Sequence, residues 1–412
     1  MHSADYQIAT LGNGIRIIHK EVTHTRIAHV GLMLDIGSRD EEDAEQGLAH
    51  FWEHMAFKGT EKRKAYHILN RLESLGGELN AYTTKEKICF YASTLDQHLE
   101  KAVDLIADIT FHATFPEKQI EKERMVILEE MALYRDTPED SLQDDFDEIL
   151  FQNHPLGKNI LGTTKTVKSF GKSHFRSFID RNLDTSKVIL SSVGNYPLRK
   201  LLRYAQKHLD DVKPSATDRV RKPFDGFQPT TEAVHKPITQ AHCAIGSVAF
   251  PIDHPRRTTL FMLLNILGGP GMNSRLNLSL REKYGFVYGI DANYSPFLDT
   301  GAMSIYFATE AKNLKKSQQL IWKEFDKLKE KPLGKLQIHA ARQQIKGQLA
   351  MSEENYSGMM LMMAKSLLDL EKVMSIDSVF DKIEAITAHD LVEIARQCLN
   401  KEQMSILSYL PE

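Results

Sequence analysis

The segment HFWEH at residues 50–54 constrains the fold of this chain more than any other feature. Its flanks are apolar, with Leu48 before it and Met55 after it, so the sequence predicts a largely buried helix that begins near Gly47. The two histidines are four residues apart and therefore lie on one face of that helix, with Glu53 beside them. Because burial of unpaired polar and charged groups costs free energy, the fold must supply partners for these side chains.

A metal ion is one partner that would satisfy all three side chains. The order H-x-x-E-H is the inverse of the commoner H-E-x-x-H pattern and is the inverzincin signature. It predicts that His50 and His54 bind Zn²⁺ and that Glu53 acts as a general base beside the metal. The same five residues can also form a solvated helix face, so the hypothesis requires a third ligand elsewhere in the chain.

The helix predicted from Pro116 to about Tyr134 is the candidate source of the third ligand. Its glutamates are Glu117, Glu121, Glu123, Glu129 and Glu130. Glu123 and Glu130 are seven residues apart and share a face, so one could bind zinc while the other orients a ligating histidine. Spacing alone does not choose between them.

The composition of the chain excludes several classes of protein. Its 412 residues carry a net charge of −3, with no basic arm or acidic tail that would indicate nucleic acid or an anionic membrane. No apolar run is long enough to span a bilayer, and residues 1–7 resemble neither a secretory signal nor an organelle presequence. Cys89, Cys243 and Cys398 are far apart, which predicts buried, reduced thiols in a cytoplasmic protein.

The order strand, helix, strands, helices occurs twice along the chain. Strands are predicted over residues 15–19, 27–34, 87–93, 188–193, 242–250, 286–294 and 302–309. Helices are predicted over residues 65–75, 99–109, 116–134, parts of 142–151, 258–267, 276–282, 315–329 and 336–351. A methionine-rich helix around residues 359–363 is expected to pack in a core rather than to form a binding surface.

This repetition predicts an α+β fold of two structurally repeated domains, each a mostly antiparallel sheet flanked by helices. Residues 1–210 are expected to form an N-terminal zinc-binding domain and residues 237–412 a C-terminal repeat. Between them, residues 211–236 are interrupted by prolines and show little apolar periodicity, so we interpret them as an interdomain linker.

The surroundings of the motif resemble a known family. Residues 47–60, GLAHFWEHMAFKGT, are similar to the pitrilysin-type zinc metallopeptidases of family M16, and most of all to the mitochondrial-processing-peptidase-like group and its small bacterial relatives. Residues 123–130, ERMVILEE, resemble that family's third-ligand helix. Glu130 follows His54 by 76 residues (130 − 54), as in the family. The resemblance implies a processing-peptidase/LuxS-like metallohydrolase fold.

It also implies roles for individual residues. One zinc ion per chain would be bound by His50, His54 and Glu130, with Glu53 as the general base. Glu123 would be a carboxylate that orients a ligating histidine by a hydrogen bond without contacting the metal itself. Other divalent ions could replace zinc in vitro. A further family-like stretch contains His154, which we interpret as structural because the ligand set is already complete.

Three further segments resemble parts of the family that handle substrate. Residues 76–83, with Asn80 and Ala81, resemble the segment of the active-site edge strand, where a peptide binds as an added strand. Arg281 and Tyr288 resemble a pair that holds a substrate carbonyl and a developing oxyanion. The last segment resembles a glycine-rich loop that contacts substrate, here through Gly268, Gly269 and Gly271.

The resemblance implies a dimer, because one chain supplies half of the four-domain chamber typical of the family. Arg281 and Tyr288 would then act on the zinc of the partner subunit. The partner could be identical or different, and the substrate is expected to be an unfolded protein or a short peptide. The alternative is a non-catalytic or partner-dependent subunit of a hetero-oligomeric processing peptidase or scaffold, against which the complete ligand set argues.

Overall fold

The computed structural model describes residues 6–412 and divides by internal contacts into two compact units. The first comprises the chain up to Ala132, Lys158–Lys222 and Met351–Ser375; the second comprises Leu133–Gly157, Pro223–Ala350 and Ile376–Glu412. Each unit is therefore discontinuous in the sequence. The domain boundaries predicted at residues 210 and 237 stay predictions. The expectation about the extreme N-terminus rests on residues 1–7, of which 1–5 lie outside the described residues. Within residues 6–412, no helix combines the length and the apolar character needed to cross a membrane.

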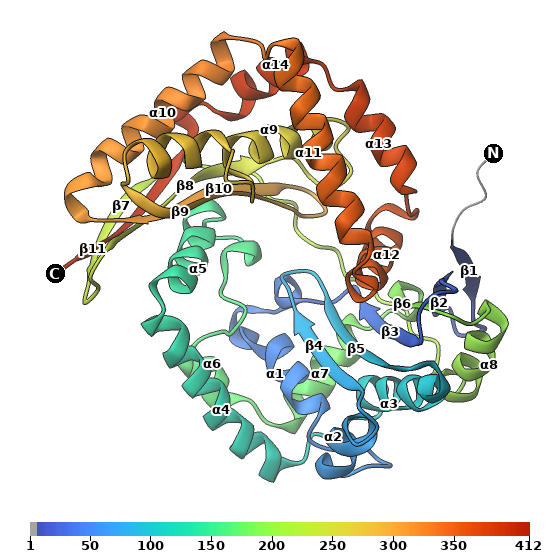
Figure 1. Ribbon diagram of the computed structural model, residues 1–412. Helices are drawn as coiled ribbons and strands as arrows, with labels where there is room; N and C mark the ends of the chain where they lie inside the picture. The colour runs from blue at the N-terminus through green and yellow to red at the C-terminus, as the bar shows by residue number, and fades with distance from the viewer. Residues whose placement is uncertain (1–5) are drawn as a thin grey trace. The chain divides into compact units, whose positions relative to one another are not determined.

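The first unit contains a six-stranded sheet with the strand order β1-β2-β6-β3-β5-β4 (Figure 1). The strands are β1 (Gln7–Thr10), β2 (Arg16–Glu21), β3 (Ile27–Leu34), β4 (Glu78–Thr83), β5 (Ile88–Leu95) and β6 (Val188–Gly194). All neighbours are antiparallel except β2 and β6. The helices of this unit are α1 (Leu48–Ala56), α2 (Ala65–Glu73), α3 (Leu99–Phe111), most of α4 (Glu117–Asp136), α6 (Thr164–Ser169), α7 (Lys172–Asn182), α8 (Leu198–Leu209) and α12 (Tyr356–Leu370).

The two faces of this sheet are buried by different helices. On β3, Val30 and Leu32 point into the core that contains α1, α3 and α7, whereas Met33 points to the opposite face. That opposite face is covered by α12, whose Met360 and Met363 are buried. The prediction that the methionine-rich helix packs in a core is therefore confirmed.

The second unit repeats this architecture with the strand order β7-β11-β8-β10-β9. Its strands are β7 (Thr231–Lys236), β8 (Ala241–Ala249), β9 (Val287–Pro296), β10 (Gly301–Thr309) and β11 (Ser405–Pro411). They correspond in order to β2, β3, β4, β5 and β6, and the single parallel pair, β7 with β11, stands where β2 and β6 stand in the first sheet. The predicted fold class, two repeated α+β domains with mostly antiparallel sheets, is confirmed.

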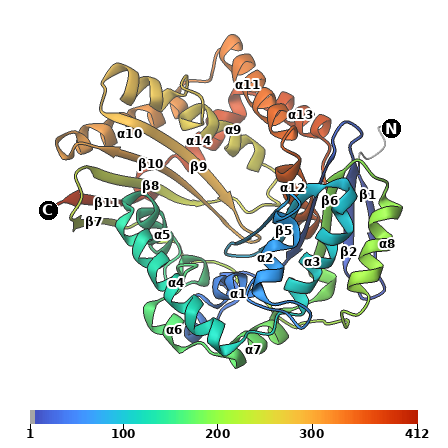
Figure 2. The same ribbon diagram turned by 60° about the horizontal axis from the view of Figure 1, so that its bottom comes forward.

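Helices cover both faces of the second sheet as well. They are α5 (Pro138–Leu150), α9 (Arg257–Gly268), α10 (Leu314–Glu330), most of α11 (Lys335–Glu353), α13 (Ile376–Ala385) and α14 (Ala388–Cys398). In Figures 1 and 2, α9, α10 and α14 lie on one face. The other face packs against α5, through Leu142 and Phe146. Each sheet is thus completed by a helix from the other half of the sequence, α12 in the first unit and α5 in the second.

The strongly periodic elements occur where the sequence predicted them, and β3 spans the predicted residues 27–34. Other elements differ from the predictions, and no helix is predicted at α8, α13 or α14. The helix predicted over residues 276–282 is a π-helix, η6 (Asn277–Lys283). Strand β7 lies inside the segment interpreted as a linker, and β11 was not predicted. All three cysteines are free, as expected, but Cys398 is only partly buried.

Candidate metal centre and catalytic site

Helix α1 carries the motif, and its N-terminus is built for close packing. The N-cap residue Gly47 has a φ of +94°, and a Cβ there would meet the carbonyl oxygen of Leu161 at 2.5 Å, so only glycine fits. The buried Glu41 carboxylate accepts hydrogen bonds from the backbone N–H of Gly47 at 2.9 Å and of Ala49 at 2.7 Å. Burial raises the pKa of Glu41 well above its ordinary value, although these two donors act to lower it. Glu41 thus satisfies backbone donors that the helix itself leaves open.

One side of α1 is anchored in the apolar core of the first unit. Phe51 packs edge-on against Phe175 with ring centroids 5.2 Å apart, and Trp52 packs in the same way against Phe178 at 6.4 Å. These contacts fix the rotation of the helix about its axis. The histidines and Glu53 are therefore held on the side that meets α4 and the end of β4.

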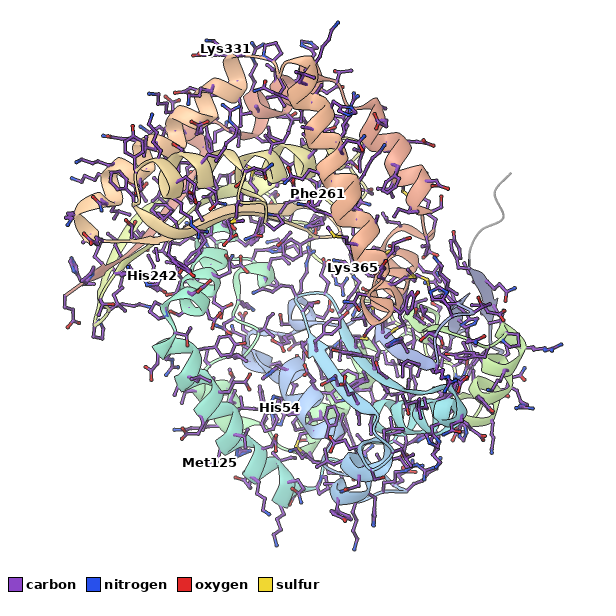
Figure 3. The ribbon with its side chains drawn as sticks, viewed as in Figure 1. His54, Met125, His242, Phe261, Lys331 and Lys365 are labelled. Carbon is purple, nitrogen blue, oxygen red and sulfur yellow. The ribbon has the colours of Figure 1, made fainter. Side chains whose placement is uncertain are left out.

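The structure brings His50, His54 and Glu130 together. One ligand atom from each lies within 4.8 Å of the others. The Nε2 atom of His50 is 3.7 Å from Oε1 of Glu130, and the Nε2 atom of His54 is 3.4 Å from Oε2. Figure 3 marks His54 on α1, and Met125 on α4, the helix that carries Glu130.

These separations fit a zinc ion. Zinc bonds to nitrogen and oxygen of about 2.0–2.1 Å in a tetrahedral site place neighbouring ligand atoms about 3.3 Å apart. The distances of 3.4 and 3.7 Å are close to that value, and the longer one exceeds hydrogen-bonding range. Two imidazoles and one carboxylate also form a usual donor set for catalytic zinc. The residues present therefore fit the metal that the motif implies.

Glu123 contacts His54 through Nδ1, the ring nitrogen that does not face Glu130. Its Oε1 lies 3.0 Å from Nδ1 of His54, and its Oε2 accepts a hydrogen bond from Nζ of Lys58 at 2.7 Å. Burial acts to raise the pKa of Glu123, but these two partners outweigh it and the pKa is lowered. The bond through Nδ1 leaves Nε2 of His54 directed toward Glu130.

The two histidines of the metal-free protein differ in charge. Burial and, to a smaller extent, the neighbouring His54 lower the pKa of His50 to about 4, although Glu130 acts to raise it, so His50 is neutral at pH 7. Burial also acts to lower the pKa of His54, but hydrogen bonds with Glu123 and Glu130 outweigh it and raise the pKa to about 9. A proton on His54 thus sits where a metal would sit, and metal binding must displace it.

Glu53 lies beside this group and has a separate partner. The hydroxyl of Thr83, the last residue of β4, donates to Oε2 of Glu53 at 2.5 Å. Burial raises the pKa of Glu53 above its ordinary value, which the bond from Thr83 partly offsets. A carboxylate with a raised pKa is better matched to taking up and releasing a proton near neutral pH.

The predicted peptide-binding residues of the first unit lie on an edge strand. Strand β4 pairs only with β5 in the described sheet, with Asn80 opposite Tyr91 and Ala81 opposite Phe90. One edge of β4 is therefore not used within the sheet. Ala81 packs toward the core, so this strand offers mainly its backbone along that edge.

The remaining predicted residues belong to the second unit. The guanidinium of Arg281, on η6, lies 5.4 Å from the centre of the Tyr288 ring, on β9, and Tyr288 is 90% exposed. Gly268 ends α9, and Gly269 and Gly271 follow it. A Cβ at Gly271 would lie 2.5 Å from the side chains of both Asn273 and Gln344, whose amides bond to each other, so this loop is held against α11.

Several glutamates offered by the sequence lie outside the group. Glu117, Glu121 and Glu129 are exposed, and Glu121 pairs with Arg124. His154 is 5% exposed and packs edge-on against Phe224, which accords with a structural role. Sequence reasoning missed Glu41, Lys58 and Thr83. Of these, only Lys58 and Thr83 lie in segments that resemble the family, residues 47–60 and 76–83.

Comparison with known proteins places the chain in a family. Residues 16–164 match the family model described as Insulinase (Peptidase family M16), and residues 169–345 match the one described as Peptidase M16 inactive domain. An uncharacterized zinc protease of Bacillus subtilis, YmxG, is 32% identical over 395 residues, which cover 95% of each chain. An uncharacterized zinc protease of Rickettsia bellii is 30% identical over 97% of each chain. The chain belongs to peptidase family M16.

Solved structures agree on the fold. A peptidase M16 inactive domain from Pseudomonas fluorescens has a TM-score of 0.90 at 18% identity, over 99% of both chains. A protease from Helicobacter pylori has a TM-score of 0.90 at 21% identity, over 98% of this chain and 99% of that one. At these identities the likeness concerns the fold alone.

Proposed function

We propose that this protein is a zinc-dependent endopeptidase that hydrolyses unfolded or short peptides. The observation that carries the proposal is the convergence of His50, His54 and Glu130 within 4.8 Å, with the Glu53 carboxylate on the same helix as both histidines. Membership of a peptidase family supports it, as do relatives whose names describe them as zinc proteases.

His50, His54 and Glu130 would hold one zinc ion per chain. The chemistry that zinc supplies in sites of this kind is Lewis-acid activation of water and of the peptide carbonyl. Glu53 accepts a proton from the attacking water at its carboxylate and delivers it to the nitrogen of the leaving amine. Glu123 keeps the His54 ring in the orientation that its role as a ligand requires.

The substrate would bind along β4 as an added strand. The edge of β4 beside Asn80 and Ala81 is not used by the sheet, and backbone hydrogen bonds along such an edge read few side chains. That mode suits extended peptides of varied sequence.

Gly268, Gly269 and Gly271 are proposed as a second, weaker set of substrate contacts on the basis of the family resemblance alone.

The finer part of the proposal concerns assembly. The family resemblance implies a dimeric chamber in which Arg281 holds a substrate carbonyl and Tyr288 donates to the developing oxyanion of the site in the partner subunit. The exposure of Tyr288 and the nearby guanidinium are compatible with donor roles toward a bound peptide. The partner could be a second copy of this chain or a different one.

Cleavage of a quenched, unstructured peptide by the purified chain tests the proposal. It is measured with and without a chelator and beside Glu53→Gln, with the zinc content of both proteins determined. We expect chelator-sensitive cleavage that Glu53→Gln abolishes while it retains zinc. Turnover by a zinc-loaded Glu53→Gln protein would remove Glu53 from the mechanism. Bound zinc without cleavage would favour a partner-dependent subunit, and neither zinc nor cleavage would favour a scaffold.

A further inference from the structure

The end of β4 lies directly against the Glu53 carboxylate. Along β4, Leu79 and Ala81 point to the face of the sheet that packs against α1, α3 and α7, so Thr83, two residues further on, points the same way. Its hydroxyl donates to Oε2 of Glu53 at 2.5 Å. Within residues 6–412, no hydrogen bond is found at the second oxygen, Oε1. One carboxylate oxygen is thus anchored, and the other is left to exchange a proton.

The turn that follows Thr83 is fixed by buried charges. Glu86 accepts a hydrogen bond from Arg39 at 2.6 Å, and the side chains are 7% and 2% exposed. Lys87 pairs with Asp369, at the end of α12, at 2.5 Å with both side chains under 5% exposed. Buried ion pairs of this kind are costly to break, because the partner that remains is left as an uncompensated charge.

The backbone of the same turn is also enclosed. The N–H of Arg39 donates to the carbonyl of Lys85 at 2.7 Å, and Nζ of Lys85 reaches the carbonyl of Lys158 at 2.6 Å. A Cβ at Gly37 would meet the backbone of Lys85 and Glu86 at 2.5 Å, so no side chain fits between the two segments. The residues after Thr83 therefore have little freedom to move, and neither has the Thr83 hydroxyl.

We propose that Thr83 is a positioning residue for the general base: its hydroxyl, held by the locked turn at residues 84–87, orients the Glu53 carboxylate for proton transfer. The inference rests on the proposed function, since it assigns Thr83 a role in that reaction. It requires a hydroxyl at position 83 rather than a side chain of a given size. A glutamate side chain has several rotatable bonds, so without this anchor its carboxylate would sample other orientations.

The test compares three single variants of the full chain. Thr83→Val keeps the shape and removes the hydroxyl, whereas Thr83→Ser keeps the hydroxyl. The matched control is Thr94→Val on the neighbouring strand β5, because the buried hydroxyl of Thr94 has no hydrogen-bond partner among the described residues. For each protein, kcat and KM for the quenched peptide, zinc content and melting temperature are measured.

We expect Thr83→Val to lower kcat by about 10- to 100-fold, the range that a misplacement of about 1 Å produces. KM, zinc content and melting temperature should stay near those of the wild type, because neither a ligand nor the β4 edge is altered. Thr83→Ser should recover most of kcat, and Thr94→Val should match the wild type. A merely structural role would lower melting temperature along with kcat and would not be rescued selectively by serine.

A crystal structure of Thr83→Val supplies a readout that does not depend on activity, and we expect the Glu53 carboxylate to leave its position beside strand β4. Full kcat in Thr83→Val, or an unmoved carboxylate, would overturn the inference while leaving the peptidase proposal intact if Glu53→Gln is inactive. Absence of metal-dependent cleavage in the wild type would instead remove the peptidase proposal, and the position of the carboxylate would still decide whether Thr83 anchors it.

Discussion

Glu123 shows how a residue that would not touch the metal can still govern its binding. Its carboxylate joins Nδ1 of His54 to Nζ of Lys58 and is almost buried. We expect Glu123→Gln to weaken zinc binding by about 10- to 100-fold, because a neutral amide supports the histidine less well than a carboxylate does. Competition with a chromophoric chelator measures this affinity. The control is Glu129→Gln on the exposed side of the same helix, and equal zinc affinity in the two variants would contradict the role of Glu123.

Glu41 is the residue on which the start of α1 depends. Its carboxylate accepts two backbone hydrogen bonds in the buried region before the motif. Glu41→Ala should lower the free energy of unfolding by about 1–3 kcal/mol, since it leaves buried N–H groups unsatisfied. Urea titration followed by circular dichroism measures the change. Glu42→Ala is the neighbouring control, because Glu42 is exposed and its ion pair with Arg181 is long, at 3.7 Å. An equal loss in both variants would argue against a specific cap.

How well the sequence predicts a residue of the candidate site depends on how far along the chain its partners lie. His50, Glu53 and His54 follow from spacing within one helix. Spacing left Glu123 and Glu130 as alternatives, and the structure separates them by distance, with Glu130 at Nε2 of His54 and Glu123 at Nδ1. Thr83 is 30 residues from Glu53 and on a strand. Such a contact depends on how β4 meets α1, which no local pattern in the sequence encodes.

At the scale of elements, α12 is the clearest case of a helix whose stability comes from tertiary packing. Its neighbouring residues Met362 and Met363 provide a matched pair, because Met362 is 45% exposed and Met363 is 2% exposed in the cluster against the first sheet. Met363→Ala should lower the free energy of unfolding by about 2–5 kcal/mol, through lost burial and the cavity that remains. Met362→Ala should cost much less.

Chemical denaturation of both variants measures this difference, with enzymatic activity recorded beside it. Because α12 also supplies Asp369 to the turn after β4, a loosened helix should lower activity together with stability in Met363→Ala. Similar free energies of unfolding for the two variants would show that α12 does not pack on the sheet as described.

The helices and strands differ in how clearly the sequence predicts them. Helices α3 and α10 have a clear apolar stripe, and both were predicted within a few residues of their bounds. Strand β7 is an exposed edge strand, and its only pairing within the described sheet is the parallel one with β11, far along the chain. Because no local turn joins these two strands, the sequence does not distinguish β7 from a linker and does not predict β11. The π-helix η6 has helical periodicity, so only its hydrogen bonding was unforeseen.

At the scale of the whole molecule, duplication of the fold does not imply duplication of the metal group. Helix α9 follows β8 as α1 follows β3, but its sequence, RTTLFMLLNILG, contains no histidine, cysteine or acidic residue. Within residues 6–412, a single cluster of metal-ligating side chains is found. The second repeat thus retains the architecture without the ligands.

We therefore expect about one zinc ion per chain, in line with one His/His/Glu group. Metal analysis of the dialysed protein measures the stoichiometry, and His50→Ala should remove the bound zinc. The control is His154→Ala, which alters a buried histidine outside the group and should keep the metal if the variant folds. Two zinc ions per chain, or zinc retained by His50→Ala, would show a second site.

The assembly itself is testable by mixing two defective chains. Glu53→Gln removes the base, and Tyr288→Phe removes a donor proposed to serve the partner's site. If Tyr288 acts in trans, a dimer of one chain of each kind contains one intact site, because the Tyr288→Phe chain keeps Glu53 and receives Tyr288 from its partner. If it acts in cis, neither site is intact. Co-expression with two different affinity tags isolates the mixed dimer, and each variant purified alone is the control. Cleavage well above that of both controls is the expected result, and a mixed dimer no more active than the Tyr288→Phe protein would exclude the trans arrangement.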